Sequence, residues 1–236
     1  MEIRGERECT TCGNRWSYYE TGQIRCPACE NPRSVGVGER KTHTAGAVQL
    51  DLTAVRTAID DEPLQQIADR ASEQCRDFVK TVGFIDAGEL QALSETYLAA
   101  CELRRVGATL GRVMNVTDEQ ELYFLRLLRG VDSGDRPPAD EVPAELHPER
   151  GLAVAVAVRA YLTDLRRILD GREEGVDSVL SAVTARRKRI EALDGDVDPA
   201  EAEVLVRALR DVAEYLREDD EAALARALER VDTEEL

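Results

Sequence analysis

Most of the chain shows the apolar spacing of amphipathic helices. From Glu62 onward, apolar residues recur every three or four positions and so fall on one face of a helix. This spacing predicts helices over residues 62–82, 90–108, 118–128, 154–168, 175–193, 199–217 and 220–231. Helices of this length joined by mostly short turns are typical of an antiparallel all-α bundle.

Capping residues indicate where some of these helices begin. Asp118 is predicted to be an N-cap, and Glu121, three residues later, completes a capping box. The helix that follows, Leu122–Leu128, is apolar nearly all round, which predicts that it is buried. Asp198 and Pro199 are a typical opening for a later helix.

The helical spacing is missing from the middle and from the beginning of the chain. Four prolines between residues 133 and 150 predict a long loop. Near the N-terminus, residues 15–19 are predicted to form a strand, residues 20–22 a turn and residues 23–25 the return strand of a hairpin. A weak pattern over residues 46–61 predicts a connecting segment.

The charge divides the chain in the same way. The net charge is −16, yet residues 1–45 carry +1, and the rest of the chain carries −17. Basic residues are 28 Arg against 3 Lys. An acidic, lysine-poor surface keeps a protein hydrated in concentrated salt, so we expect a halophilic protein; the alternative is an ordinary acidic protein from a GC-rich genome.

We expect the protein to be cytoplasmic and without a membrane partner. The opening MEIRGERECT has no apolar signal-peptide core. The longest uncharged apolar run, residues 152–158, is too short to span a bilayer. Thiols stay reduced in the cytoplasm, so paired cysteines there indicate a metal before a disulfide.

Two Cys-x-x-Cys pairs carry the strongest chemical signal. Cys9 and Cys12 are followed, after thirteen residues, by Cys26 and Cys29. A two-residue gap lets both sulfurs of a pair face one ion, and two such pairs complete a tetrahedron. We therefore expect these four residues to bind a structural Zn²⁺, whose full thiolate shell leaves no position for a catalytic water. Iron is the rival metal.

The residues around the cysteines resemble a known module. Cys9-Thr10-Thr11-Cys12-Gly13, then Trp16, then Cys26-Pro27-Ala28-Cys29 resemble the zinc ribbon of the transcription-factor-B (TFIIB) type. The chain as a whole is similar to uncharacterised haloarchaeal zinc-ribbon proteins with an acidic helical C-terminal region. Glu30 departs from the pattern, because Gly usually follows the second pair. The resemblance implies binding to polymerase subunits, nucleic acid or other proteins.

The predicted fold class is thus a small β zinc ribbon followed by an all-α antiparallel helical bundle. The predicted domains are a zinc ribbon over residues 1–45, a connecting segment over residues 46–61 and an acidic all-α helical domain over residues 62–236.

Aromatic and basic residues of the ribbon raise the possibility of nucleic-acid binding. Trp16 is expected to cover the small core of the hairpin, the alternative being a base-stacking platform. Tyr19 is the better candidate for an exposed contact, beside Arg15 and Arg25. A net charge of +1 is too small for a basic patch, so this function is an alternative and not our first choice.

The remaining candidates favour structural interpretations. Within Arg186–Arg189, Arg186 is expected to bury its stem and the run to be a solvated helix face. Cys75 and Cys101 lie on apolar helix faces and are expected to act as small buried hydrophobes. His43 follows the ribbon, but four thiolates already satisfy a metal. His147 lies in the proline-rich loop.

No catalytic arrangement or phosphate-binding fingerprint is found, so we expect no enzyme. The expected function is a zinc-binding, non-enzymatic adaptor with protein partners of unknown identity. The alternatives are a transcription- or RNA-associated nucleic-acid binder and, with iron, a rubredoxin-like electron carrier.

Overall fold

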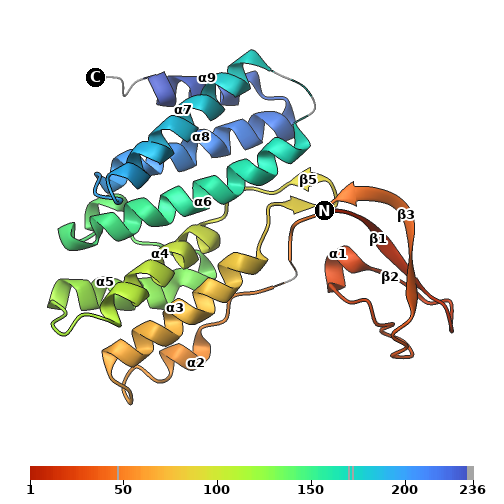
Figure 1. Cartoon of the computed structure of the whole chain (residues 1–236), viewed down its shortest axis with the longest axis horizontal. Helices are drawn as coiled ribbons and strands as arrows, with labels where there is room; N and C mark the ends of the chain where they lie inside the picture. The colour runs from red at the N-terminus through yellow and green to blue at the C-terminus, as the bar shows by residue number, and fades with distance from the viewer. Residues whose placement is uncertain (47, 170, 172, 233–236) are drawn as a thin grey trace.

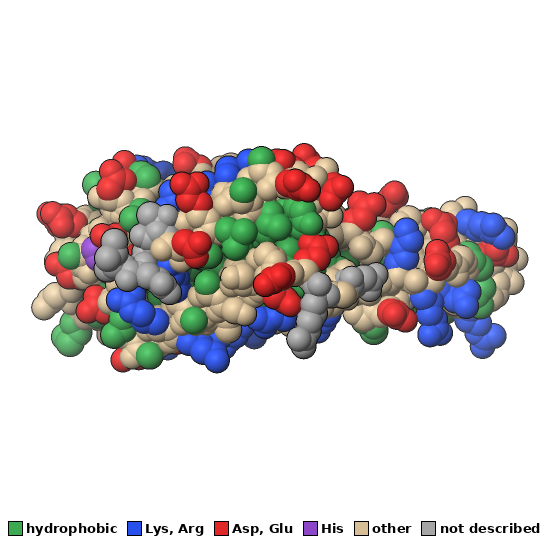
Figure 2. Space-filling view, turned by 90° about the horizontal axis from the view of Figure 1, so that it is seen from above, with side chains coloured by type: hydrophobic (Ala, Val, Ile, Leu, Met, Phe, Trp, Pro, Cys, Tyr) green, Lys and Arg blue, Asp and Glu red, His purple; other side chains and the backbone are tan. Residues whose placement is uncertain are grey.

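The computed structural model describes residues 1–46, 48–169, 171 and 173–232. It consists of a small N-terminal sheet region, residues 1–46, and a mostly helical body that follows it. Figure 1 shows the sheet region projecting from one end of the helical body. From above, in Figure 2, acidic side chains are spread over the helical body, and blue basic side chains are prominent on the sheet region.

A three-stranded antiparallel sheet forms the N-terminal region. Its strands are β1 (Glu2–Cys9), β2 (Arg15–Ser17) and β3 (Ser34–Thr42), in the order β2-β1-β3. The first strand is central, with Arg7 opposite both Trp16 and Gly36. Because each outer strand hydrogen-bonds to β1, the beginning and the end of the region are tied together.

The predicted hairpin of residues 15–25 is wrong. Residues 18–21 form a short helix, α1 (Tyr18–Thr21), and no strand follows at residues 23–25. The Ser17 side chain accepts a hydrogen bond from the Glu20 N–H, which caps the helix, and Gly22 ends it with φ +64°. These are ordinary capping residues, and here they outweigh the β-propensity of the two tyrosines.

In the described part of the chain, the helical body contains the seven predicted helices and one short one. In chain order these are α2 (Thr53–Arg56), α3 (Leu64–Thr81), α4 (Glu95–Leu110), α5 (Asp118–Gly130), α6 (His147–Ile168), α7 (Glu174–Ala192), α8 (Pro199–Glu218) and α9 (Glu221–Asp232). A two-stranded antiparallel ladder, β4 (Ile85–Asp86) with β5 (Glu89–Leu90), lies between α3 and α4. None of the described helices is long and apolar enough to cross a membrane.

The start of α5 differs from the prediction by one residue. Thr117, not Asp118, is the N-cap, and its capping partner is Gln120, not Glu121. The helix is also less buried than predicted, since Leu122 is 59% exposed. Phe124, Leu127 and Leu128 are buried, so only one face of α5 enters the core.

The predicted loop of residues 133–150 is shorter and more ordered than expected. It contains two 3₁₀ turns, Ala139–Glu141 and Ala144–Leu146, after a third at Val131–Ser133. Helix α6 already begins at His147, with Pro148 in its first turn. Proline fits there because the first helical N–H groups have no partner within the helix, which explains why Pro148 does not mark the loop.

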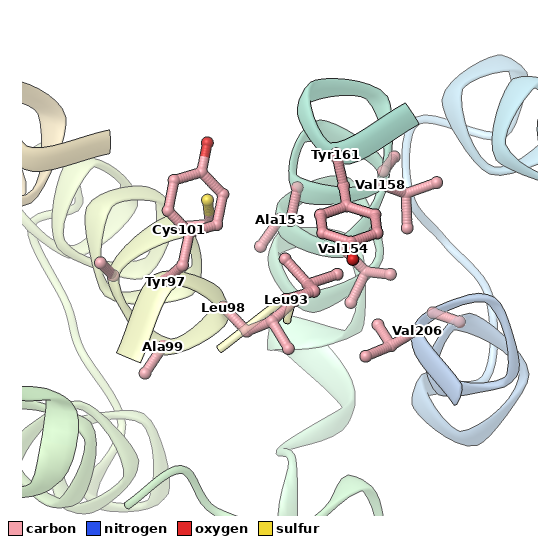
Figure 3. Packing of buried hydrophobic residues seen from close by; sticks show 14 of the residues in the cluster. Leu93, Tyr97, Leu98, Ala99, Cys101, Ala153, Val154, Val158, Tyr161 and Val206 are labelled. Carbon is pink, nitrogen blue, oxygen red and sulfur yellow. The ribbon is translucent and has the colours of Figure 1, made fainter. Parts of the chain in front are cut away.

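One hydrophobic core runs through the helical body. Figure 3 shows its centre, where Tyr161 of α6 lies between Tyr97 of α4 on one side and Val206 of α8 on the other. The core also takes in Leu52 and Val55, both fully buried, from the segment 46–61. Asp198 accepts a hydrogen bond from the Ala200 N–H, so the predicted opening of α8 is confirmed.

A buried charge network crosses this core. The Glu102 side chain on α4 is fully buried and accepts hydrogen bonds from the Tyr123 hydroxyl and, at 2.5 Å, from Arg150 Nη1. Glu203 on α8 accepts at 3.0 Å from Arg150 Nε and at 2.7 Å from Arg136 Nη2. The network therefore joins helices α4, α5, α6 and α8 through charge-assisted hydrogen bonds.

The sheet region is attached to the helical body through polar contacts. Thr44 Oγ1 donates to Asp164 Oδ2 at 2.5 Å, and the same oxygen accepts from the Phe84 N–H at 2.8 Å. The Gly88 N–H donates to the Thr42 carbonyl at 2.8 Å. These contacts hold the end of β3 against the β4–β5 ladder.

Candidate metal centre

Two matching backbone turns present the four cysteines. In the first, Gly13 N–H donates to the Cys9 carbonyl at 3.0 Å, and Cys9 N–H donates to the Asn14 carbonyl at 2.9 Å. In the second, Glu30 N–H donates to the Cys26 carbonyl at 2.9 Å, and Cys26 N–H donates to the carbonyl of residue 31 at 3.0 Å. The two turns thus repeat the same hydrogen bonds at the same spacing.

The sulfur atoms of the four cysteines lie close together. All four Sγ atoms lie within 4.8 Å of one another. The Sγ atoms of Cys9 and Cys29 are 3.6 Å apart, and those of Cys12 and Cys26 are also 3.6 Å apart. A metal bound at about 2.3 Å to four tetrahedral sulfurs would set them about 3.8 Å apart. The donor set therefore fits a tetrahedral metal site.

Backbone hydrogen bonds prepare the two buried sulfurs for this role. The backbone N–H groups of Cys12 and Thr11 lower the pKa of Cys9 to about 6. For Cys26, burial raises the pKa, but hydrogen bonding led by the Cys29 N–H outweighs it, and the pKa is lowered. Because the thiolate is the form that binds metal, both buried cysteines are predisposed to coordination.

Among the described residues, no His, Asp, Glu or further Cys side chain joins the cluster of four cysteines. Cys9 and Cys26 are buried, and Cys12 and Cys29 are on the surface. His43, which follows the sheet region, is not part of the cluster. Its Nδ1 atom instead lies 3.3 Å from Asp86 Oδ1. Four ligands of one kind complete a tetrahedron, so the arrangement can hold a metal without leaving a ligand position for substrate.

The second turn uses a residue that does not suit it. Gly13 has φ +71°, and Glu30 at the matching position has φ +57°. The left-handed region costs little for glycine but about 1–2 kcal/mol for other residues. Glu30 therefore keeps the turn geometry that glycine would give, and the departure seen in the sequence changes the strain of the turn but not its hydrogen bonds.

The chain matches the family of unknown function DUF7117 over residues 1–231. The chain belongs to DUF7117. Neither curated proteins nor solved structures give a match. The candidate metal centre of this DUF7117 chain therefore rests on its own geometry.

Trp16 fills the core beside the metal centre, as predicted. It is 8% exposed and forms a small hydrophobic cluster with Cys9 and Cys26. Its indole Nε1 donates to the Gln23 carbonyl at 2.8 Å. The ring thus covers the two buried cysteines and fixes the chain that leads to the second cysteine pair.

Tyr19 is not the exposed contact that we predicted. Its ring lies against Gly5, where a Cβ atom would come within 1.8 Å of it, and its hydroxyl donates to the Ile3 carbonyl at 3.2 Å. The centroid of the ring is 4.7 Å from that of His43. Of the other two residues proposed for base contacts, Arg15 pairs with Glu8 at 2.6 Å. The three side chains thus do not form one open surface.

The other candidates of the DUF7117 chain are structural. Cys75 and Cys101 are buried in the helical core, as predicted. Arg186 is half-buried and its Nη2 donates to the Val231 carbonyl at 2.6 Å, whereas its neighbour Arg187 is buried and pairs with Glu191. The basic run is therefore not one solvated face. His147 lies in the first turn of α6, 3.2 Å from the carbonyl of residue 142.

Proposed function

We propose that this DUF7117 chain is a zinc-binding, non-enzymatic adaptor. The observation that carries the proposal is the pair of matching turns that place four sulfurs at tetrahedral spacing. In the proposal, Zn²⁺ binds Cys9, Cys12, Cys26 and Cys29 and holds the sheet region as a ribbon of the transcription-factor-B type. Bound zinc supplies folding free energy to a region whose own core is very small.

The sheet region offers a surface that could contact another protein. Ile24 is 54% exposed and Val35 is 49% exposed. The segments that carry them are joined where Ser34 Oγ donates to the Ile24 carbonyl at 2.6 Å. A near-neutral, partly apolar surface beside a strongly acidic body favours a protein partner over nucleic acid, whose binding needs more positive charge. We name this surface, Ile24 and Val35, the ribbon patch.

The helical domain would supply the second half of the adaptor. We propose that its long helices form an antiparallel bundle, rigid enough to hold the ribbon at one end, as their packing in Figure 1 suggests. A cytoplasmic location and adaptation to high salt fit the charge of −16 and the scarcity of lysine.

Affinity capture with matched variants tests the adaptor function. The full chain, a metal-site variant with Cys26→Ser and Cys29→Ser, and a ribbon-patch variant with Ile24→Asp and Val35→Asp are used as bait at high KCl, with and without nuclease. The control is Leu122→Asp with Leu193→Asp, two exposed apolar residues of the helical body. The captured proteins are identified by mass spectrometry.

The adaptor proposal predicts a defined partner that survives nuclease, persists with the control and is lost with both ribbon variants. A partner that is lost on nuclease treatment would favour the nucleic-acid alternative. Capture unchanged by either ribbon variant would contradict a recognition role for the ribbon.

Metal analysis tests the identity of the ion separately. The proposal predicts one zinc per chain by inductively coupled plasma mass spectrometry and none in the metal-site variant. One iron per chain with the red colour of an iron–thiolate site would instead support the electron carrier.

A further inference from the structure

A cavity in the helical body is lined by four arginines. It has a volume of about 510 Å³ and lies between α3, α4 and the beginning of α6. Arg76 comes from α3, Arg104 and Arg105 come from α4, and Arg112 follows α4. The carboxylate in the lining is that of Glu149. Four guanidinium groups thus surround one cavity in a chain whose net charge is −16.

Three of these guanidinium groups have no ion pair or hydrogen bond within the described part of the chain. Glu149 is engaged by Arg105 Nε at 3.0 Å and by Thr109 Oγ1 at 2.6 Å. That leaves Arg76, Arg104 and Arg112 without a partner. We call these three residues the arginine triad.

Most arginines in the described part of the helical body have a partner, unlike the triad. Within the described residues of the helical body, two more arginines, Arg129 and Arg207, also lack one, and each of these lines a separate cavity. The remaining ones are held by carboxylates, carbonyls or hydroxyls. With more acidic than basic residues in the chain, three unpartnered arginines in one cavity are not explained by a shortage of carboxylates.

The backbone holds the triad in place. Helices α3 and α4 approach so closely that a Cβ on Gly107 would lie 2.6 Å from the Ala68 carbonyl oxygen. Ser72 is buried, and its hydroxyl donates to the Arg104 carbonyl at 2.8 Å. Arg104 lies on α4, and Arg112 lies two residues beyond Leu110, the last residue of that helix. The fold therefore brings like charges together around one cavity, at an electrostatic cost that an anion would remove.

The chemistry of the cavity indicates the kind of ligand. Arginine presents a planar fork of donors that matches the oxygens of phosphate or carboxylate. Three guanidinium groups provide more hydrogen-bond donors and more positive charge than a single phosphate or carboxylate group needs. Ala108 and Val113 add an apolar part to the wall, and the volume falls within the range of small-molecule sites.

We propose that this cavity binds a small polyanion, a molecule with at least two neighbouring phosphate or carboxylate groups, through Arg76, Arg104 and Arg112. Such a ligand site is independent of the zinc ribbon and adds to the adaptor function a means by which a charged metabolite stabilises the helical body.

Ligand titration of the full, metal-loaded chain tests the proposal. Inorganic pyrophosphate, ATP and citrate are titrated separately by isothermal calorimetry and by thermal unfolding. The buffer is potassium chloride at one fixed concentration, at which circular dichroism shows the folded chain, so that competition from chloride is the same in every titration. A ligand at about a hundred times its Kd should raise Tm by about 5–10 °C. The three probes distinguish inorganic phosphate, nucleotide and carboxylate ligands.

Two charge-matched variants locate the site. Arg104→Gln with Arg112→Gln should weaken binding of the best probe at least tenfold. Arg33→Gln with Arg40→Gln removes the same charge from exposed, unpartnered positions in the sheet region and should leave Kd within about twofold. Circular dichroism of each variant confirms that the helical body is folded.

The proposal is overturned if none of the three probes binds or raises Tm. It is equally overturned if both double variants weaken binding to the same extent, because binding would then follow net charge and not the cavity. These outcomes do not depend on zinc content or on protein capture, so they are separate from failure of the adaptor function.

Discussion

Glu30 and Gly13 occupy the same position in two turns that share the same hydrogen bonds, and their φ angles are +57° and +71°. Glu30→Gly should therefore stabilise the metal site by about 0.5–1 kcal/mol, because the relief of left-handed strain exceeds the extra entropy of glycine in the unfolded chain. Gly13→Glu should destabilise it by a similar amount. No atom lies within 4 Å of a Cβ placed on Gly13, so the cost there is one of backbone strain alone.

Competition with a chromogenic chelator measures both changes as zinc affinity. Opposite shifts of similar size are expected. If both substitutions weaken zinc binding, the Glu30 side chain contributes something other than strain.

The buried thiols Cys75 and Cys101 give the second prediction at this scale. Burial raises the pKa of each to about 12 from an ordinary value of 9.0. Below pH 9 both the folded and the unfolded chain keep these protons. Above pH 9 the unfolded chain releases them and the folded chain does not, so stability falls as pH rises, by about 1.4 kcal/mol per thiol at pH 10.

Guanidinium unfolding at pH 8 and pH 10 measures this loss. The double variant Cys75→Ala with Cys101→Ala should be less stable than the natural chain at pH 8 because of the cavities it leaves, yet it should lose about 3 kcal/mol less on going to pH 10. An equal loss in both proteins would show that other groups cause the alkaline sensitivity.

Residues whose chemistry depends on local spacing could be predicted from the sequence. The cluster of four cysteines follows from two short gaps, and the apolar spacing identified Cys75 and Cys101 as core residues. Tyr19 was wrongly predicted to be exposed, because the residues that pack against its ring, Gly5 and His43, are distant from it in the sequence. The arginine cavity was missed because its arginines come from α3, from α4 and from the turn after α4, and only the three-dimensional structure shows that they line one cavity without carboxylate partners.

Among the elements, the long helices were easier to predict than the sheet. Their apolar spacing repeats over many residues and sets both their number and their order. Strand β1, Glu2–Cys9, consists mostly of charged residues and contains few apolar ones. Its sequence therefore lacks the alternation of apolar and polar residues that predicts a strand. It forms a strand because its backbone hydrogen-bonds to β2 on one side and to β3 on the other. Its pairing is tertiary information, as is the choice of Thr117 over Asp118 as N-cap.

The buried pair Glu102–Arg150 gives a prediction about how the helices are held together. Glu102→Gln removes the charge that faces Arg150 and the Tyr123 hydroxyl in a fully buried position. Breaking one side of a buried pair leaves the other charge poorly compensated, so the free energy of unfolding should fall by about 3–5 kcal/mol.

Arg126→Gln is the matched control for this change. Arg126 pairs with Glu141, and both side chains are more than 40% exposed. Exposed pairs contribute about 0–1 kcal/mol, so urea unfolding should change little. Equal losses in the two variants would mean that the buried network does not contribute more than a surface pair.

At the scale of the whole molecule, the sheet region and the helical body have separate hydrophobic cores. The cluster of Cys9, Trp16 and Cys26 does not join the core of the helices. The two parts meet through polar contacts such as Thr44 to Asp164. Their charges differ as well, with +1 over residues 1–45 and −17 over the rest. Each part should therefore depend on different interactions for its stability.

Removal of the metal should unfold the first part and leave the second. Trp16 is the single tryptophan of the chain and covers two of the proposed ligands, so its fluorescence reports on the sheet region alone. Treatment with EDTA should shift its emission to the red, because the ring becomes solvated. The circular dichroism signal at 222 nm comes from the helices and should remain nearly unchanged.

The variant with Cys26→Ser and Cys29→Ser should show the same red-shifted emission before EDTA is added, and adding zinc should restore the emission only in the natural chain. Loss of both signals together would mean that the polar contacts at residues 42–44 couple the two parts into one folding unit. In that case the metal would stabilise the helices as well. Separate loss, with the helical signal intact, would establish that the sheet region depends on its metal because its own core of three residues is too small to fold it.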